Sequence, residues 1–548
     1  MRLCPTRIEG DIVMRYIFTM MRLVFGVILL IAVTSCSKSK VESLMEQIPA
    51  DVDMVAVCDV KSLVESLDGT VNGSSIQIPD DVFSVLYDSE KNRLNEFLSD
   101  LNDSGIDAGV CALFSNLNDK YGLYIVVSID DTDSFANTLK DEDYVKKDEK
   151  NGYAFYVKKS DCYTSFVVIK DSYAYLLPEV HAGGDDVLKQ ERHIVKVLGK
   201  AEKKPFSTTN MSKYIAENNA GGMSLRLSDE VRKFLEREGL PSDIADKSTA
   251  YACCRFDLND NNARLTMKMF DKDGEVMKID DFNDSFDMNA TLNPEAMKYL
   301  HNDEFLLAGF TLKDVDWDKI GESLGDVLPA DDMAVWIVVK SYLEKIDGTV
   351  ACGVGIKDGK SSFFDIGSKP NDNELLAATL VFEIKKGKAQ SIVNDMKVLL
   401  EKEGIPFNET AGGLKIPEIG DFAMITLNVE AKDNYLIISN FPVKQYDNAI
   451  LKNLDLKDLN AIAVLDLQKG NLILDFLGID DRVKVVLSSN VNTMEVTLDL
   501  EFGEHGKKGL LSKVLKTIID IEQRAQLQDN LNTYGEYDEY DEDEAVVE

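Results

Sequence analysis

The chain has 548 residues, 45% of them hydrophobic, and a formal net charge of −36 at pH 7. At roughly 100–200 residues per domain, this length leaves room for two or more hydrophobic cores. So acidic a body repels nucleic acid phosphates and anionic lipid head groups, which argues against nucleic acid as a partner and against electrostatic attraction to a membrane.

A strongly apolar run, Leu23–Val33, follows the basic residues Arg15 and Arg22 and is followed closely by Cys36. The run is about half of the roughly 20 residues that a membrane-spanning helix needs, and it has the length of a signal-peptide core. The arrangement resembles a bacterial lipoprotein signal, in which the leader is cut just before a cysteine that is then acylated, for example with palmitate. We therefore predict a signal peptide over residues 1–35 and lipidation of Cys36, against the alternative of an ordinary secretory leader.

The residues around the cleavage point refine this prediction. Ser37 follows the cysteine where an aspartate would be expected for inner-membrane retention, so resemblance to lipoprotein sorting favours the outer membrane. Residues 37–41 lack an acidic cluster, which favours the periplasmic leaflet over the cell surface. Several acyl chains would make the membrane anchoring permanent, since one chain binds only marginally. Glu9 and Asp11 do not suit a leader, so we expect Met14 or a later methionine to be the true start.

Past the leader, one order of elements occurs twice. The strand-like opening 48–60 corresponds to 302–312, at an offset of about 250 residues, which exceeds any solenoid period and indicates a duplicated domain. Tight turns such as Asn151–Gly152 and Ala411–Gly413 predict antiparallel hairpins in both copies. The segments with three-and-four apolar spacing predict amphipathic helices. These helical segments are 82–101 and 187–194 in the first copy, and 333–346 and 389–400 in the second.

We therefore predict an α+β fold of two homologous domains, each a mainly antiparallel sheet with amphipathic helices packed on it. The tail is acidic and lacks apolar periodicity, which predicts disorder. The predicted boundaries are a signal peptide at 1–35, an acylated tether at 36–47, a first α+β repeat at 48–285, a second at 286–525, and the tail at 526–548.

These features together resemble a known group of proteins. The leader, the Ile-Pro-Ala-Asp opening at 48–51 with the apolar strand Val55–Val57, and the two-copy layout are similar to large lipoproteins of Bacteroidota that carry a domain of unknown function. The resemblance covers most of the mature chain through hydrophobic patterns. It implies no activity and supplies no catalytic residues.

Metal and redox chemistry find little support in the chain. His181, Asp185 and Asp186 are the one place where a histidine and carboxylates converge locally, and they could form a loop metal site. They fit better as a glycine-rich turn and a cap for the helix that follows. No cysteine pair has the CxxC spacing, so we expect free buried thiols and no cofactor.

Catalytic motifs are equally sparse. The chain has no HExxH and no GxSxG sequence. Gly353–Gly359 looks like a phosphate loop, but the pattern after it is that of a strand, so a hairpin is the better interpretation. A helix with lysines at 507–516 could rest on a membrane surface, although packing on a sheet is the simpler expectation.

The leading functional prediction is a non-enzymatic, membrane-anchored envelope lipoprotein that binds or scaffolds an envelope protein partner. The alternative is a hydrolase that uses dispersed carboxylates at a cleft between the domains, and a third hypothesis is a ligand carrier with a large apolar cavity. An enzyme should have a deep pocket holding titratable groups, whereas a scaffold should show shallow grooves or an exposed apolar patch.

Overall fold

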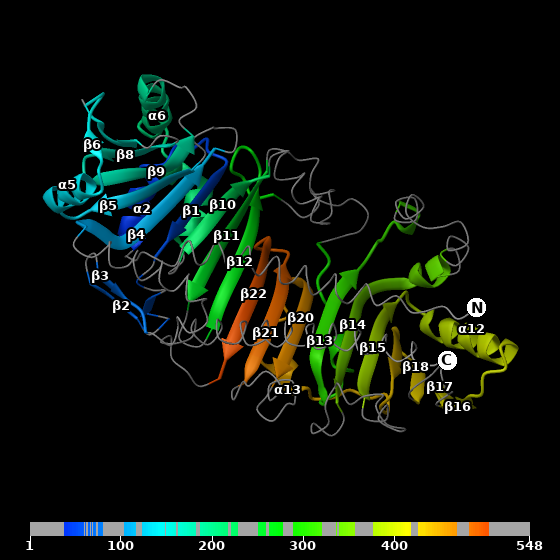
Figure 1. The fold of residues 1–548 in the computed structure, drawn as a ribbon. Helices are drawn as coiled ribbons and strands as arrows, with labels where there is room; N and C mark the ends of the chain where they lie inside the picture. Colours follow the sequence, from blue (N-terminus) through cyan, green and yellow to red (C-terminus); the bar gives the residue numbers. More distant parts are fainter. Residues whose placement is uncertain are drawn as a thin grey trace, which may run out of the picture. The chain divides into compact units, whose positions relative to one another are not determined.

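The computed structural model describes a large part of the chain, in two compact units (Figure 1). The first unit ends at Val276 and the second extends from Met277 to Gly503. The predicted signal peptide, Cys36, the lysine-bearing helix at 507–516 and the acidic tail lie outside the described residues. The described residues are 38–59, 61, 64–65, 67, 69–72, 75–79, 104–116, 123–147, 149–159, 163–181, 187–217, 221–227, 250–258, 262–277, 289–319, 336, 339–356, 376–417, 426–467 and 482–503.

Unit 1 is built on antiparallel strands. Its helices and strands, in chain order, are α2 (Lys38–Met45), β1 (Met54–Cys58), β2 (Thr70–Asn72), β3 (Ser75–Gln77), β4 (Ile106–Ser115), β5 (Leu123–Ile129), α5 (Thr132–Asp141), β6 (Val145–Lys146), β7 (Ala154–Lys159), β8 (Tyr163–Lys170), β9 (Tyr173–His181), α6 (Val187–Ala201), the 3-10 helix η2 (Phe206–Thr208), α7 (Asn210–Ala216), β10 (Gly221–Arg226), β11 (Tyr251–Leu258) and β12 (Asn262–Phe270). The order of strands in its main sheet is β12-β11-β10-β1-β4-β5-β9-β8-β7-β6, and every pairing is antiparallel.

Unit 2 has its own antiparallel strands. Its helices and strands, in chain order, are α9 (Pro294–Met297), β13 (Glu304–Leu312), β14 (Ile346–Ile356), β15 (Leu376–Ile384), α12 (Ala389–Lys402), β16 (Asn408–Glu409), β17 (Gly413–Ile416), β18 (Leu427–Lys432), β19 (Tyr435–Ser439), α13 (Ala449–Lys452), β20 (Leu459–Leu467), β21 (Val483–Asn490) and β22 (Glu495–Phe502). Its strand order is β22-β21-β20-β13-β14-β15-β19-β18-β17-β16. Each strand therefore occupies the position of its counterpart in unit 1, with β13 in the place of β1.

The core of unit 1 lies between the sheet and its N-terminal helix. Phe114 of β4 and Tyr124 of β5 are fully buried and stack with their ring centroids 4.7 Å apart. Leu44 and Met45, at the end of α2, are buried in the same cluster. The segment 36–47, which we expected to be a tether, thus contributes a helix to the folded body from Lys38 onward.

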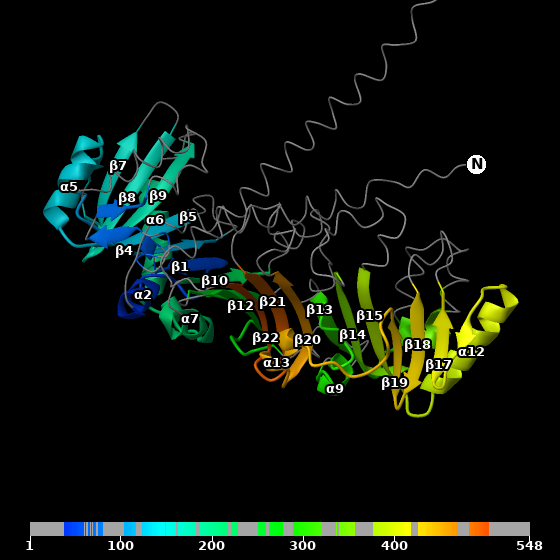
Figure 2. The same cartoon turned by 90° about the horizontal axis from the view of Figure 1, so that it is seen from below.

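Unit 2 buries one sheet face beneath short helices. α9 and α13 lie on that face (Figure 2). Met297 of α9 is buried against β13, where Gly309 leaves it room because a side chain there would meet its sulfur. The longer helix α12 packs through Ile392 and Val393 into a second cluster with β17, β18 and β19.

The predicted α+β class is wrong. Strands make up 46% of the described residues and helices 24%, and the structure is dominated by antiparallel sheet with few helices on it. Apolar alternation extends over strands of nine to eleven residues such as β13 and β14, whereas α9 and α13 are single turns of four residues. Segment 82–101 and much of 333–346, which suggested further helices, lie outside the described residues. No helix in the described part of the chain is long and apolar enough to cross a membrane.

Candidate functional site

A buried carboxylate lies at the start of β13. Glu304 is 0% exposed and pairs with Gly355 of β14. A side chain at Gly353 would collide with the Glu304 carboxylate, and one at Gly355 would collide with the backbone of Asp303. The two glycines therefore belong to a strand that another backbone and a carboxylate approach closely. The resemblance of this segment to a phosphate loop has no structural basis, since both glycines lie within β14.

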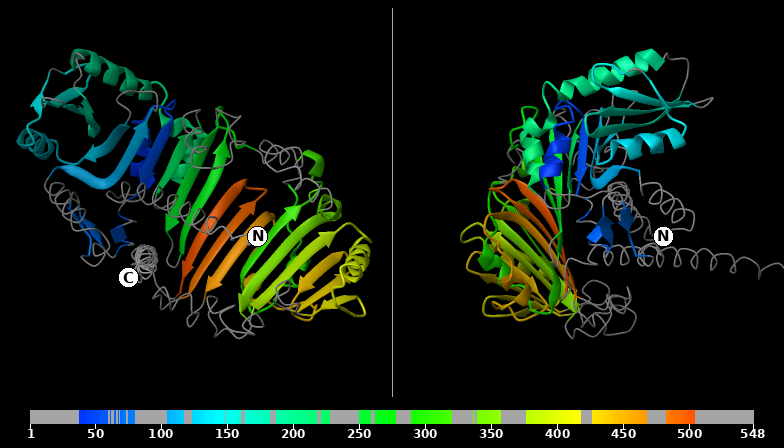
Figure 3. Two further views of the ribbon diagram at one scale, coloured as in Figure 1. Left: turned by 45° about the vertical axis from the view of Figure 1, so that its right-hand side comes forward. Right: turned by 90° about the vertical axis from the view of Figure 1, so that its left-hand side faces the viewer.

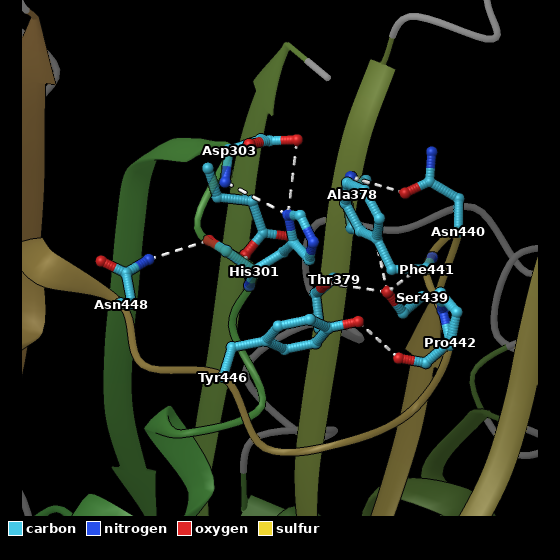
Figure 4. Close-up of polar contacts among 11 residues, drawn as sticks. His301, Asp303, Ala378, Thr379, Ser439, Asn440, Phe441, Pro442, Tyr446 and Asn448 are labelled. Atoms are coloured by element: carbon cyan, nitrogen blue, oxygen red, sulfur yellow. Dashed lines mark hydrogen bonds and ion pairs between the residues drawn. The ribbon is translucent and has the colours of Figure 1, made fainter. Parts of the chain in front are cut away.

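The backbone of His301 contacts this carboxylate, and the His301 ring packs against two aromatic side chains (Figure 4). The His301 N–H donates a 2.7 Å hydrogen bond to Oε2 of Glu304, whereas Oε1 has no partner among the described residues. The His301 ring stacks on Phe441 with centroids 3.6 Å apart, and Tyr446 meets the same ring edge-on at 4.4 Å. Three aromatic rings thus pack together next to the start of β13.

The loop that follows β19 holds these rings in place (Figure 4). Tyr446 donates its hydroxyl to the Pro442 carbonyl at 2.6 Å. The Asn448 amide donates to the His301 carbonyl at 2.8 Å, while its oxygen caps α13 by accepting from the backbone of Ile450. Burial raises the pKa of Tyr446, and the nearby Glu304 charge adds to that effect.

Burial also raises the pKa of Glu304 to about 7. The hydrogen bond from the His301 backbone and the nearby Thr379 hydroxyl oppose the shift in the pKa, and the charge of Asp303 adds to it. A carboxyl group with this pKa can exchange a proton near neutrality, which is what a general acid requires. A general acid must also reach its substrate, however, and this side chain has no exposed surface. The arrangement thus provides a proton-binding group inside unit 2.

A groove of about 640 Å³ lies beside this cluster, next to α9 and α13. Tyr446 and Asn448 line the groove and also contact His301, so a molecule in the groove would touch residues that hold His301 beside Glu304. Its apolar lining is Leu292, Pro294, Met297, Leu451, Leu454 and Leu456, and its charged lining is Lys298, Asp447, Lys452, Asp455, Lys457 and Asp458. Equal numbers of lysines and aspartates give the rim no net charge.

The opposite sheet face of unit 2 carries an apolar row. Cross-strand partners in an antiparallel sheet share a face, and the registers join seven apolar residues in this way, one from each of seven adjacent strands. The row is Leu498, Leu487, Ala463, Ala308, Cys352, Leu380 and Ile438. With strands about 4.8 Å apart, it is about 29 Å long. Leu487 and Leu380 are 46% and 41% exposed, and the other members are half-buried. The strands that carry it lie side by side in Figure 3.

Few of the residues singled out by the sequence can be placed in a site. His181 ends β9, and Asp185 and Asp186 lie outside the described residues, as does Cys36. Within the described ranges, no group of histidine, cysteine, aspartate or glutamate side chains could hold a metal ion. The free state of the cysteines is confirmed for those that are described, namely Cys58, Cys111, Cys253, Cys254 and Cys352.

Comparisons with known proteins do not identify a family for this chain. No family model matches the chain, and no curated protein matches it. One solved structure, entitled "Structure of crystal form IV of TP0453", is similar over 41% of this chain and 79% of its own, with 8% sequence identity and a TM-score of 0.23.

Proposed function

We propose that the chain is a lipid-anchored protein of the cell envelope that binds an apolar surface of a protein partner and catalyses no reaction. The observation that carries this proposal is the apolar row of unit 2, which crosses seven strands and leaves Leu380 and Leu487 exposed. Folded proteins rarely leave a large contiguous apolar surface in water unless it binds something. An exposed apolar patch and a shallow groove are also what we expected of a scaffold.

The composition of the row suits such a partner. Its members carry no charged group and only one weak hydrogen-bond donor, the thiol of Cys352. Binding of a partner is therefore favoured by roughly 25 cal/mol for each Å² of apolar surface that it removes from water. The entropy lost on association reduces this gain. We expect the acylated Cys36 to hold the protein at the outer membrane, with the periplasmic leaflet favoured, so the partner would be an envelope component.

Site-specific photocrosslinking tests the binding role. A photoreactive residue at position 380 or 487 should capture the same envelope protein, and the product should be lost when the other position is changed to lysine. Leu399 of α12 is a matched control, because it is 50% exposed in the same unit but lies outside the row. The proposal fails if positions 380 and 487 capture no common protein, or if position 399 captures it equally well.

A further inference from the structure

Helix α6 concentrates positive charge in an acidic chain. Lys189, Arg192 and Lys196 are exposed and follow each other at three- and four-residue spacing, which puts them on one side of the helix. The one acidic residue of α6, Glu191, is buried and forms an ion pair with Lys150. The outward side of α6 is therefore cationic, and the helix stands at the periphery of unit 1 (Figures 1 and 3).

These charges are not used inside the described part of the protein. None of the three cations forms an ion pair with a described residue, although Lys200, one turn further on, pairs with Asp51 at 2.7 Å. A hollow of about 540 Å³ lies between α6 and the turn that precedes β7. Its lining is Glu149, Lys150, Asn151, Arg192, Val195 and Lys196, and because Lys150 is already paired with Glu191, Arg192 and Lys196 outnumber Glu149 by one charge. The site therefore favours an anion.

An apolar side chain lies among the cations. Leu188 is 49% exposed and directly precedes Lys189, while Ile194 and Leu198 on the inward side of the helix are buried. A helix that exposes an apolar residue beside lysine and arginine has the pattern of an interfacial helix, which inserts the apolar group between lipid head groups. A small free anion would make no use of Leu188, so the pattern favours a lipid surface.

The expected anchor, Cys36, closely precedes the first described helix of unit 1 in the sequence. α2 begins at Lys38, just after Cys36, and its eight residues span about 12 Å. The segment after α2 meets the end of α6, where Lys200 pairs with Asp51, and it meets η2, where the Phe206 N–H donates to the Ile48 carbonyl at 2.7 Å. An acyl group on Cys36 would hold α6 near the membrane, a step that depends on the anchor in the proposed function.

We propose that the outward face of α6 binds the head groups of anionic phospholipids and lays unit 1 on the membrane surface. The net charge of −36 led us to expect repulsion from such lipids. Local charge decides the contact, because screening limits electrostatic forces to about 8–10 Å at ordinary ionic strength. Three cations and a leucine on one helix face can therefore bind where the chain as a whole is repelled.

Vesicle sedimentation tests this proposal. The chain from Ser37 to the C-terminus keeps every described residue and lacks the acylated cysteine, so its binding does not depend on lipidation. It should sediment with vesicles containing 30% phosphatidylglycerol. Neutralising one of the three cations should lower the partition coefficient about fivefold. The variant K189E/R192E/K196E should lose about 100-fold or more of its partition coefficient, and L188S should lose several-fold. Binding should also weaken as salt is raised.

The variant K140E/K213E/K272E is the matched control, since it changes the same charge at three exposed positions of unit 1. It should bind vesicles like the parent chain, and both triple variants should show unchanged circular dichroism. Equal binding by both triple variants would overturn the proposal, as would equal binding to pure phosphatidylcholine. Displacement from vesicles by millimolar inorganic phosphate would assign the site to a free anion instead. An unmodified Cys36 in cells would refute the predicted lipid anchor, but it would not affect the vesicle-binding result for α6.

Discussion

Replacing Glu304 by glutamine should remove a pH dependence from the stability of unit 2. The folded protein holds the carboxyl proton up to a pKa of about 7, whereas an exposed glutamate releases it near the reference value of 4.5. Because the folded state binds the extra proton, the contribution of Glu304 to the stability of unit 2 is highest below pH 4.5 and falls as the pH rises toward 7. At 1.36 kcal/mol per pKa unit, the loss is about 3 kcal/mol.

The glutamine variant cannot ionise and keeps an oxygen for the hydrogen bond from the His301 N–H. We therefore expect E304Q to be more stable than the parent by up to about 3 kcal/mol at pH 8, and to differ little from it at pH 4.5. Other acidic groups titrate in both proteins, so their contributions cancel when the two are compared at each pH.

Urea unfolding followed by tryptophan fluorescence is the suitable assay. The chain has two tryptophans, and both belong to unit 2, where the rings of Trp317 and Trp336 lie 6.4 Å apart. The signal therefore reports unit 2 alone. E401Q is the control, since Glu401 is exposed on α12, and it should follow the parent at every pH. If the parent and E304Q lose stability in parallel between pH 4.5 and 8, burial does not hold the proton on Glu304 and the reasoning is refuted.

Two further outcomes follow from the same structure. Gly353→Ala should destabilise unit 2 by about 1–3 kcal/mol through overpacking against the Glu304 carboxylate, and by less in an E304A background; equal costs in both backgrounds would contradict the contact. Cys58 and Cys253 are buried thiols whose pKa values burial raises, that of Cys253 to about 12, so mass mapping should find them labelled by a disulfide reagent only as unit 1 unfolds. Rapid labelling of either thiol in the native protein would show that its strand opens.

Local signals in the sequence gave reliable local structure. The Asn151–Gly152 turn predicts positive φ at both positions, and the observed values are 55° and 80°. The helix expected from Val187 is α6, in which Ile194 is buried and Leu188 is exposed. These features depend on neighbouring residues alone, which is why one sequence suffices to predict them.

The fold class failed because it depends on long-range pairing. β1 pairs with β4 on one side and with β10 on the other, and Met54 meets Ser115 and Leu225 in the two registers. Nothing in the local pattern near Met54 specifies those partners. The three-and-four spacing did identify the helices α6 and α12 where the chain is described, so the error lies in the weight given to helices against strands.

Glu304 was missed for the same reason. In the sequence it is one acid at the start of an apolar strand, and the residues that approach its carboxylate, Gly353 and Thr379, lie far along the chain. The available signal was the pair of glycines at alternate positions 353 and 355, which in a strand indicates close approach by another group. We had interpreted them as part of a hairpin.

The connection that follows β9 in unit 1 and β19 in unit 2 distinguishes the two units. In unit 1 the chain between β9 and β10 builds α6, η2 and α7, and it carries the cationic face. In unit 2 the chain between β19 and β20 builds the loop over His301 and the single turn α13, and it carries the groove. Because connections can change without altering strand pairing, a shared strand order does not require a shared role. Binding of lipid head groups by unit 1 and of an apolar partner by unit 2 can therefore be removed separately, the first by K189E/R192E/K196E and the second by lysine at position 380.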